Sequence, residues 1–259
     1  RVARLVSLRT LVCRPDRHFR SLCARDISTA FLQSMKYAPS EPARYAKFRD
    51  PTTGEFEYFR QSGPIYGEAS APIRWEKTLA VALESAGFQR GQNDPSLYYN
   101  PETNVAVIVY VDDILADGDK AAVTEFMSWL ETRFECREPE WLTIESPIQY
   151  IGIDIWLDST HVHMSMSYYV EKLSKLLDIG RGRKVTSPIT SDIMDDTPLR
   201  KELVKAFRSG LGGTGWLANT VRPDIAFAQS RISQHMANPT EGAYRALVHL
   251  MRYLCHYPN

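Results

Sequence analysis

The apolar and polar positions change their period along the chain. In the first two thirds, short apolar runs separated by turn residues predict β-strands, with two longer amphipathic helices between them. In the last third, apolar positions recur every three or four residues, and prolines stand near the predicted helix starts. The pattern therefore predicts an α+β region followed by an all-helical region, joined by a polar linker over residues 181–198.

The expected elements can be given as residue ranges. The helical region should contain helices over residues 168–177, 199–220, 223–236 and 239–253. The α+β region should contain a helix over 1–12, a strand over 21–27, a small hairpin over 45–59, a helix over 70–86, a strand from residue 94, strands over 105–109 and 114–116, a helix over 119–134 and a second hairpin over 148–165.

The stretch Tyr110-Val111-Asp112-Asp113 joins two of these apolar strands and puts two carboxylates side by side at a tight turn. Adjacent carboxylates repel each other, so such a pair is either exposed to water or neutralised by cations. Magnesium is the expected cation, because it prefers oxygen ligands and binds one or two carboxylates together with substrate phosphates. Asp26 ends the strand over 21–27 and is a candidate third ligand. An exposed acidic turn is the alternative interpretation.

Composition narrows the class of protein. The 31 basic and 31 acidic residues cancel, which argues weakly against a nucleic-acid partner. Acidic residues are concentrated in residues 76–159 and basic residues on both sides, a distribution that suits a metal centre with basic walls and also suits an ordinary charged surface. The four cysteines form no C-x-x-C pair, so we expect reduced thiols and no zinc. No apolar run is long enough for a membrane span, and we expect an intracellular protein.

Five motifs recur along the chain at characteristic spacing, namely Asp26–Leu32, Tyr66–Trp75, Asp94–Tyr98, Tyr110–Asp113 and Tyr150–Ile155. In this order they resemble the motifs of copia-type retrotransposon reverse transcriptases. The tail phrase Thr220–Ala228 resembles the same family, so the similarity extends over nearly the whole chain.

The resemblance implies a right-hand polymerase fold. Its antiparallel palm sheet, with helices on one face, would comprise residues 21–35 and 66–165. Partial fingers would comprise residues 1–20 and 36–65, and residues 166–259 would form a helical thumb or connection region.

The resemblance also implies the chemistry. Asp26 and Asp112 would bridge two Mg²⁺ ions, with Mn²⁺ as a substitute, supported by Asp113 and by the carbonyl of Ile27. The reaction would be RNA-directed DNA synthesis, in which a primer 3′-hydroxyl attacks a deoxynucleoside triphosphate and pyrophosphate leaves.

The family implies binding roles for further residues. Phe31 would be the aromatic gate that excludes a ribose 2′-hydroxyl, while Gly67, Pro72 and Tyr110 would lie at the nucleotide. The hairpin over 148–165, with Tyr150 and Gly152, resembles the primer grip. Basic residues of the thumb would contact duplex phosphates, namely Lys172, Lys175, Arg181, Arg183 and Lys184.

The sequence departs from the family at several points. Glu68 and Ala69 stand where the family has Leu and Lys, which exchanges a cation for an anion beside the triphosphate site. No lysine occurs between Lys120 and Lys172, so Arg137 is the remaining candidate to give a proton to pyrophosphate, and arginine is a poor acid. The resemblance implies that the basic fingers segment lies upstream of Arg1 and that ribonuclease H and integrase domains belong to other parts of the same polyprotein. We therefore expect a polyprotein fragment.

Two functions follow as hypotheses. The first is a polymerase core acting on an RNA or DNA template with primer and on deoxynucleoside triphosphates, in the cytoplasm within a virus-like particle or in the nucleus, without a membrane. The second is a catalytically inactive relic that keeps the fold and binds nucleic acid. A calcium loop over residues 113–125 fails on spacing, because Leu115 and Thr124 occupy positions where carboxylates are expected.

Overall fold

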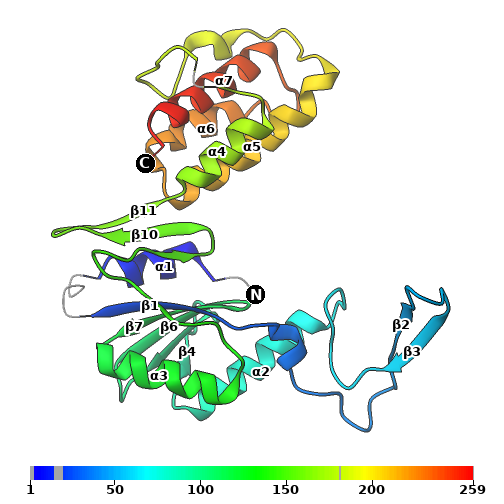
Figure 1. Cartoon of the computed structure of the whole chain (residues 1–259). Helices are drawn as coiled ribbons and strands as arrows, with labels where there is room; N and C mark the ends of the chain where they lie inside the picture. The colour runs from blue at the N-terminus through cyan, green and yellow to red at the C-terminus, as the bar shows by residue number, and fades with distance from the viewer. Residues whose placement is uncertain (1–2, 15–19, 181, 259) are drawn as a thin grey trace. The chain divides into compact units, whose positions relative to one another are not determined.

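The computed structural model describes residues 3–14, 20–180 and 182–258. The chain divides into two compact units, residues 1–151 and 152–259, which are treated separately below (Figure 1).

The first unit is built on a six-stranded antiparallel sheet. Its strand order is β4-β5-β6-β7-β1-β8, so β1, early in the chain, lies between two strands formed much later. Each neighbouring pair in this sheet is antiparallel. The strands are β1 (Ser21–Asp26), β4 (Gln89–Arg90), β5 (Leu97–Asn100), β6 (Val105–Tyr110), β7 (Asp113–Gly118) and β8 (Glu140–Trp141).

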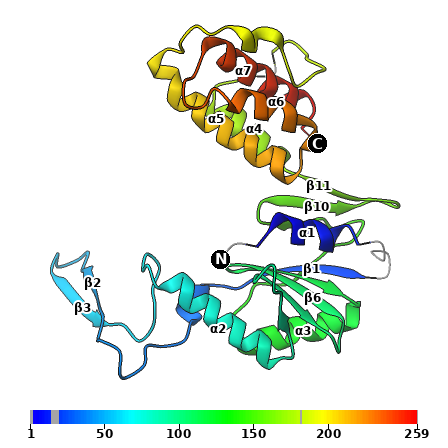
Figure 2. The same cartoon turned by 180° about the vertical axis from the view of Figure 1, so that it is seen from behind.

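Helices cover both faces of this sheet (Figures 1 and 2). Helices α2 (Ala71–Ser85) and α3 (Lys120–Arg133) pack on one face, as predicted, with Trp75, Leu83 and Leu130 in the shared apolar core. Helix α1 (Leu5–Val12) lies on the opposite face and buries Leu8, Leu11 and Val12. Both faces are buried, and accordingly β6 is almost continuously apolar and β7 has the apolar centre Ile114-Leu115-Ala116, as their sequence indicated.

The expected strand from residue 94 begins later, at Leu97. The side chain of Asp94 accepts a hydrogen bond from the backbone N–H of Ser96 at 3.0 Å, which fixes a turn before the strand. The same carboxylate accepts a hydrogen bond from Ser7 Oγ at 2.6 Å and another from the Arg4 N–H at 3.0 Å. Asp94 therefore anchors the first turn of α1 to the sheet.

Strands β2 (Tyr45–Arg49) and β3 (Phe56–Arg60) form a separate two-stranded ribbon, at the position of the expected small hairpin. The chain between the ribbon and the sheet includes the 3-10 helix η2 (Ala30–Gln33). Nearly all ribbon side chains are exposed to solvent.

The second unit is largely helical, as expected. It opens with the hairpin of β10 (Ile153–Leu157) and β11 (Val162–Ser165), and strand β9 (Ile148–Tyr150) closes the first unit before it. Gly213 lets α5 approach α4 closely, because a Cβ atom there would lie 2.6 Å from Leu173 Cδ2. The helices are α4 (Ser167–Leu176), η3 (Ser191–Met194), α5 (Lys201–Thr220), η4 (Pro223–Ile225), α6 (Ala226–Ser233) and α7 (Glu241–His256).

Within the described ranges, no helix combines the length and the apolar character that a membrane span requires.

Candidate active site

The strand register brings the three predicted catalytic aspartates to one end of the sheet. Asp26, the last residue of β1, pairs directly with Asp113, the first residue of β7. Asp112 is the neighbouring residue in the turn, and its carbonyl accepts a hydrogen bond from the Ile27 N–H at 2.9 Å. Directly opposed residues have Cβ atoms about 5 Å apart. The backbone therefore holds Asp26, Asp112 and Asp113 close together.

The turn between β6 and β7 is tight and strained. Tyr110 pairs with Asp113, which leaves Val111 and Asp112 as the two connecting residues. Val111 has a φ of 58°, in the left-handed region that β-branched residues rarely adopt. Such strain persists only where surrounding contacts hold it.

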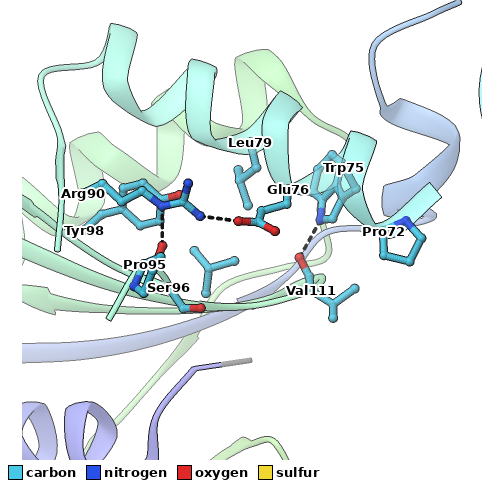
Figure 3. Close-up of a pocket in the computed structure, with 10 residues that line it drawn as sticks. Pro72, Trp75, Glu76, Leu79, Arg90, Pro95, Ser96, Tyr98 and Val111 are labelled. Atoms are coloured by element: carbon cyan, nitrogen blue, oxygen red, sulfur yellow. Dashed lines mark hydrogen bonds and ion pairs between the residues drawn. The ribbon is translucent and has the colours of Figure 1, made fainter. Parts of the chain in front are cut away.

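A buried tryptophan holds this turn. Trp75 Nε1 donates a hydrogen bond to the Val111 carbonyl at 2.6 Å (Figure 3). The indole is only 2% exposed and packs edge-on against Phe134, with ring centroids 5.2 Å apart. Its position on α2 therefore fixes where the Val111 carbonyl lies.

A small cavity of about 60 Å³ lies beside this contact, lined by Trp75, Val111, Pro72 and Tyr98 among others (Figure 3). Arg90 crosses it to form an ion pair with Glu76, and its Nε donates to the Pro95 carbonyl at 2.6 Å. These contacts tie the middle of α2 to the loop before β5, and so support the helix that carries Trp75.

The three aspartates form a site of concentrated negative charge. Burial, together with the nearby charges of Asp112 and Asp26, raises the pKa of Asp113 to about 6. Arg137 opposes this effect more weakly. Its Nε lies 3.1 Å from Asp26 Oδ1, and its backbone N–H donates to the Asp26 carbonyl at 2.9 Å. A bound divalent cation would relieve the repulsion that remains.

A polar cavity of about 190 Å³ opens at two of these aspartates, Asp26 and Asp113. Asp26 and Asp113 line it from the sheet, with Arg137 at its wall and Tyr150 also contributing. Glu138, Glu140 and Gln149 complete much of the polar lining. The cavity offers oxygen atoms for a hard cation and a cationic side chain for an anionic group.

The donor set suits magnesium, because all three side chains are carboxylates and the site is negatively charged. The described residues nevertheless contain no cluster of three or more His, Cys, Asp or Glu side chains already converged as a metal site. Asp26 instead pairs with Arg137. Binding a cation would therefore require the carboxylates to turn toward one another.

The predicted nucleotide-binding residues occupy different environments. Phe31 lies on η2, half-buried against the core, with its ring centroid 5.0 Å from that of Tyr66. Gly67 has a φ of 89°, and no atom lies within 4 Å of the position a Cβ would take, so the backbone there is open to close approach. Pro72 lies in the first turn of α2, and Tyr110 is half-buried at the end of β6. Their predicted contacts with a nucleotide stay predictions.

Glu68, the residue that departs from the family pattern, is held by its neighbours. Tyr37 Oη donates to both carboxylate oxygens at 2.7 and 2.6 Å, Ser70 Oγ donates at 2.7 Å, and Arg44 forms an ion pair. Burial acts to raise the pKa of Glu68, but the hydrogen bonds and the Arg44 charge outweigh it and lower the pKa. Its negative charge is therefore compensated locally.

The predicted primer and template residues fall in both units. Tyr150, in the first unit, is buried and its hydroxyl lies 3.4 Å from the Ile108 carbonyl, which it donates to. Gly152, which belongs to the second unit, has a φ of 77°. Lys172 and Lys175 are exposed on α4, and Lys175 Nζ pairs with Glu171 at 2.6 Å. The prediction for Arg181 lies outside the described residues, and exposed Arg183 and Lys184 stay candidates.

Two contacts were not anticipated from the sequence. The sequence pattern placed Trp75 on the apolar face of its helix, but gave no sign of its hydrogen bond to Val111. Arg137 was considered only as a proton donor, whereas the structure pairs it with Asp26. The structure gives a further reason why residues 113–125 are not a calcium loop, because two of their carboxylates have other roles. Asp117 is completely buried, and Asp119 caps α3 by accepting a hydrogen bond from the Ala121 N–H.

Comparison with protein families gives a match over residues 1–191 to the model described as "Reverse transcriptase (RNA-dependent DNA polymerase)". The telomerase of Candida tropicalis is a structural neighbour with a TM-score of 0.41 and 8% identity, covering 98% of this chain and 51% of that one.

Relatives by sequence come from plants and yeast. The Pol polyprotein from transposon RE1 of Arabidopsis thaliana is 31% identical over 202 residues, which are 75% of this chain and 13% of the polyprotein. That from transposon RE2 of the same plant is 28% identical over 241 residues, 90% of this chain and 16% of the polyprotein. The putative transposon Ty5-1 protein of Saccharomyces cerevisiae is 23% identical, covering 88% of this chain and 74% of that protein.

The chain thus spans less than a fifth of either plant polyprotein. These matches confirm the resemblance to copia-type polyproteins, and the chain belongs to the reverse transcriptase (RNA-dependent DNA polymerase) family.

Proposed function

We propose that this chain is the core of an RNA-directed DNA polymerase, with Asp26, Asp112 and Asp113 as its catalytic residues. The observation that carries the proposal is the register of β1 and β7, which sets Asp26 opposite Asp113 and beside Asp112. Family membership gives the reaction class, and this cluster of carboxylates at the strand ends supports the position of the site.

Asp26 and Asp112 would hold two divalent cations, Mg²⁺ or Mn²⁺, with Asp113 and the Ile27 carbonyl nearby. When bound, the cations would supply activation of a primer hydroxyl and stabilisation of a pyrophosphate leaving group. Trp75 keeps the turn that carries Asp112 in its strained conformation.

The other predicted residues would position substrates. Phe31 would exclude a 2′-hydroxyl by bulk, and Gly67 and Pro72 would let the backbone approach the nucleotide. Tyr150 and Gly152 would contact the primer, and Lys172 and Lys175 the phosphates of the duplex. The substrates would be an RNA or DNA template with primer and deoxynucleoside triphosphates.

An inactive, nucleic-acid-binding relic is the second candidate, favoured by two observations. Asp26 pairs with Arg137, and Glu68 and Ala69 stand where the family has Leu and Lys, which exchanges a cation for an anion. The pairing of Glu68 with Arg44 weakens the second observation, because the extra negative charge is compensated.

Primer extension on an RNA template with Mg²⁺ separates the two candidates. We expect Asp112→Asn to lower the rate of deoxynucleotide incorporation by at least about a hundredfold, a loss typical of removing one group that stabilises charge in a transition state. Asp119→Asn is the matched control, because it makes the same change at the far end of the hairpin and Asn is an equally good helix cap.

The result for the unaltered chain decides the alternative. If the folded chain incorporates no nucleotide but still binds a primer–template duplex, the relic is the better description. Equal activity in Asp112→Asn and the unaltered chain would contradict the assignment of the site.

A further inference from the structure

The ribbon of β2 and β3 has two chemically different faces. Residues paired across an antiparallel ribbon project to the same side, and successive residues of a strand project to opposite sides. The pairs Tyr45 with Arg60, Lys47 with Tyr58 and Arg49 with Phe56 therefore share one face, here named the cationic aromatic face. The pairs Ala46 with Phe59 and Phe48 with Glu57 form the other, here named the apolar face.

Aromatic rings and cations alternate on the cationic aromatic face, and all are exposed. Tyr45, Phe56 and Tyr58 are 61%, 55% and 64% exposed. Lys47 Nζ lies 3.8 Å from the ring centroid of Phe56 and 5.7 Å from that of Tyr58. No acidic residue belongs to these three pairs. Each cation therefore lies beside a ring with no carboxylate on the same face.

The cations of this face remain available for an external anion. Within the described residues, Lys47, Arg49 and Arg60 form no ion pair with a carboxylate, and Arg49 Nε donates to the Gly54 carbonyl at 3.1 Å. By contrast, Arg44 and Arg74, close to the base of the ribbon, are each paired with a glutamate.

A groove at the base of the ribbon adds to this surface. It has a volume of about 330 Å³ and is lined by Lys36, Tyr37, Arg44 and Arg60 among others. Arg60 belongs both to this groove and to the cationic aromatic face. Glu41 also lines the groove and Arg44 is paired with Glu68, so Lys36 and Arg60 are the basic groups that extend the ribbon's charge into it.

We propose that the cationic aromatic face binds single-stranded nucleic acid, with bases stacked on Tyr45 and Tyr58 and backbone phosphates contacting Lys47, Arg49 and Arg60. Exposed rings interleaved with cations are the recognised solution for binding single strands without sequence preference. The proposal does not depend on the catalytic aspartates, so it stands apart from the polymerase function.

The charge of this face favours a single strand over a protein partner of ordinary composition. Phosphates attract all three cations, and stacking on the aromatic side chains uses base faces that an intact duplex does not expose. The apolar face, with Phe48 and Phe59 in edge contact at a centroid distance of 5.8 Å, has one acidic residue and suits packing against protein.

The test measures binding of labelled single strands of uridine or thymidine, about twelve nucleotides long, to the whole chain by fluorescence anisotropy. EDTA is present, so that bound divalent cations contribute nothing. We expect Tyr45→Ala and Tyr58→Ala each to weaken binding at least about fivefold. We expect Lys47→Gln to weaken binding and to reduce the salt dependence by about one phosphate contact.

Phe48→Ala and Phe59→Ala are the matched controls, because they remove equally exposed rings from the opposite face of the same ribbon. We expect less than about a twofold change from either, since neither ring lies on the binding face. Circular dichroism of every variant checks that the fold is retained.

The proposal is overturned if both sets of variants weaken binding equally, or if the tyrosine variants bind as tightly as the unaltered chain. It is also overturned if the tyrosine variants change self-association in sedimentation and leave single-strand binding unchanged. Asp112→Asn should bind the single strand normally, so a loss of polymerisation in that variant leaves the proposal intact.

Discussion

Strand β7 carries an aspartate near each end, and the protein treats the two differently. Asp117 is completely buried, and Arg20 Nε lies 2.9 Å and Arg14 Nη1 3.4 Å from its Oδ2. Asp113 is half-buried, and the strongest charges acting on it are those of Asp112 and Asp26. Burial and these charges raise the pKa of Asp113 to about 6.

Asp117 and Asp113 differ in the source of the positive charge that neutralises them. At Asp117 the chain supplies its own arginines, so the carboxylate acts as a structural link between β7 and the N-terminal segment. At Asp113 the chain gathers further carboxylates and offers only the partial compensation of Arg137 on Asp26. A site that keeps unneutralised carboxylates together is suited to external cations.

Removing the charge of Asp117, which the chain's own arginines neutralise, should have the largest effect on stability. Asp117→Asn leaves Arg20 without its buried counter-charge, which typically costs about 3–5 kcal/mol. We expect the free energy of opening of β6 and β7, measured by native-state hydrogen exchange, to fall by that amount. Asp113→Asn is the matched variant on the same strand and should not destabilise these strands. A similar loss in both variants would contradict the comparison.

The Asp113 end should lose stability as the pH rises from about 4 to 6. Below about pH 4 the carboxyl is protonated in both the folded and the unfolded states, and the raised pKa has no effect. As pH rises toward 6, the folded state keeps the proton longer than the unfolded state, so stability falls and the full cost is present above pH 6.

We expect this loss to be about 1 kcal/mol after allowance for solvent screening. Hydrogen exchange of β7 between pH 4.5 and 7.5, corrected for the intrinsic exchange rate and recorded without divalent cations, measures it. Asp113→Asn should remove the pH-dependent part. A slope that persists in this variant would point to another titrating group.

A smaller effect should follow from loosening the turn between β6 and β7. Trp75→Phe removes the indole N–H that binds the Val111 carbonyl, a loss of about 1 kcal/mol, or about fivefold in rate. We expect kcat for nucleotide incorporation to fall by this factor while KM changes less. Trp129→Phe, on α3, makes the same change away from the turn and controls for general loss of packing. Equal effects on kcat in both variants would rule out a positioning role.

The sequence predicted the parts of the site that depend on local pattern. The apolar runs on both sides of Asp112 and Asp113 indicated a hairpin, and the strand before Asp26 indicated that its carboxylate lies at a strand end. The structure adds the register that sets Asp26 against Asp113. The predicted ribbon and the predicted helical region are also present.

Other features could not be predicted, because they depend on contacts distant in sequence. Strands β4 and β8 contain two residues each, too few to show a period. The contacts of Trp75 with Val111, Arg137 with Asp26 and Tyr37 with Glu68 join residues that are 31 to 111 positions apart. Helix α1 begins at Leu5, with Arg4 at the N-cap position, and is therefore shorter than the predicted helix.

Cation binding tests most directly whether the Asp113 end of β7 is a metal site. The measurement is the Mg²⁺-dependent change in the opening free energy of β7 at pH 7.5, compared among the unaltered chain, Asp112→Asn and Asp119→Asn. At a Mg²⁺ concentration ten times its dissociation constant, we expect a gain of about 1.4 kcal/mol in the unaltered chain and in Asp119→Asn, and little gain in Asp112→Asn. The absence of any gain in the unaltered chain, or an equal gain in Asp112→Asn, would contradict the account.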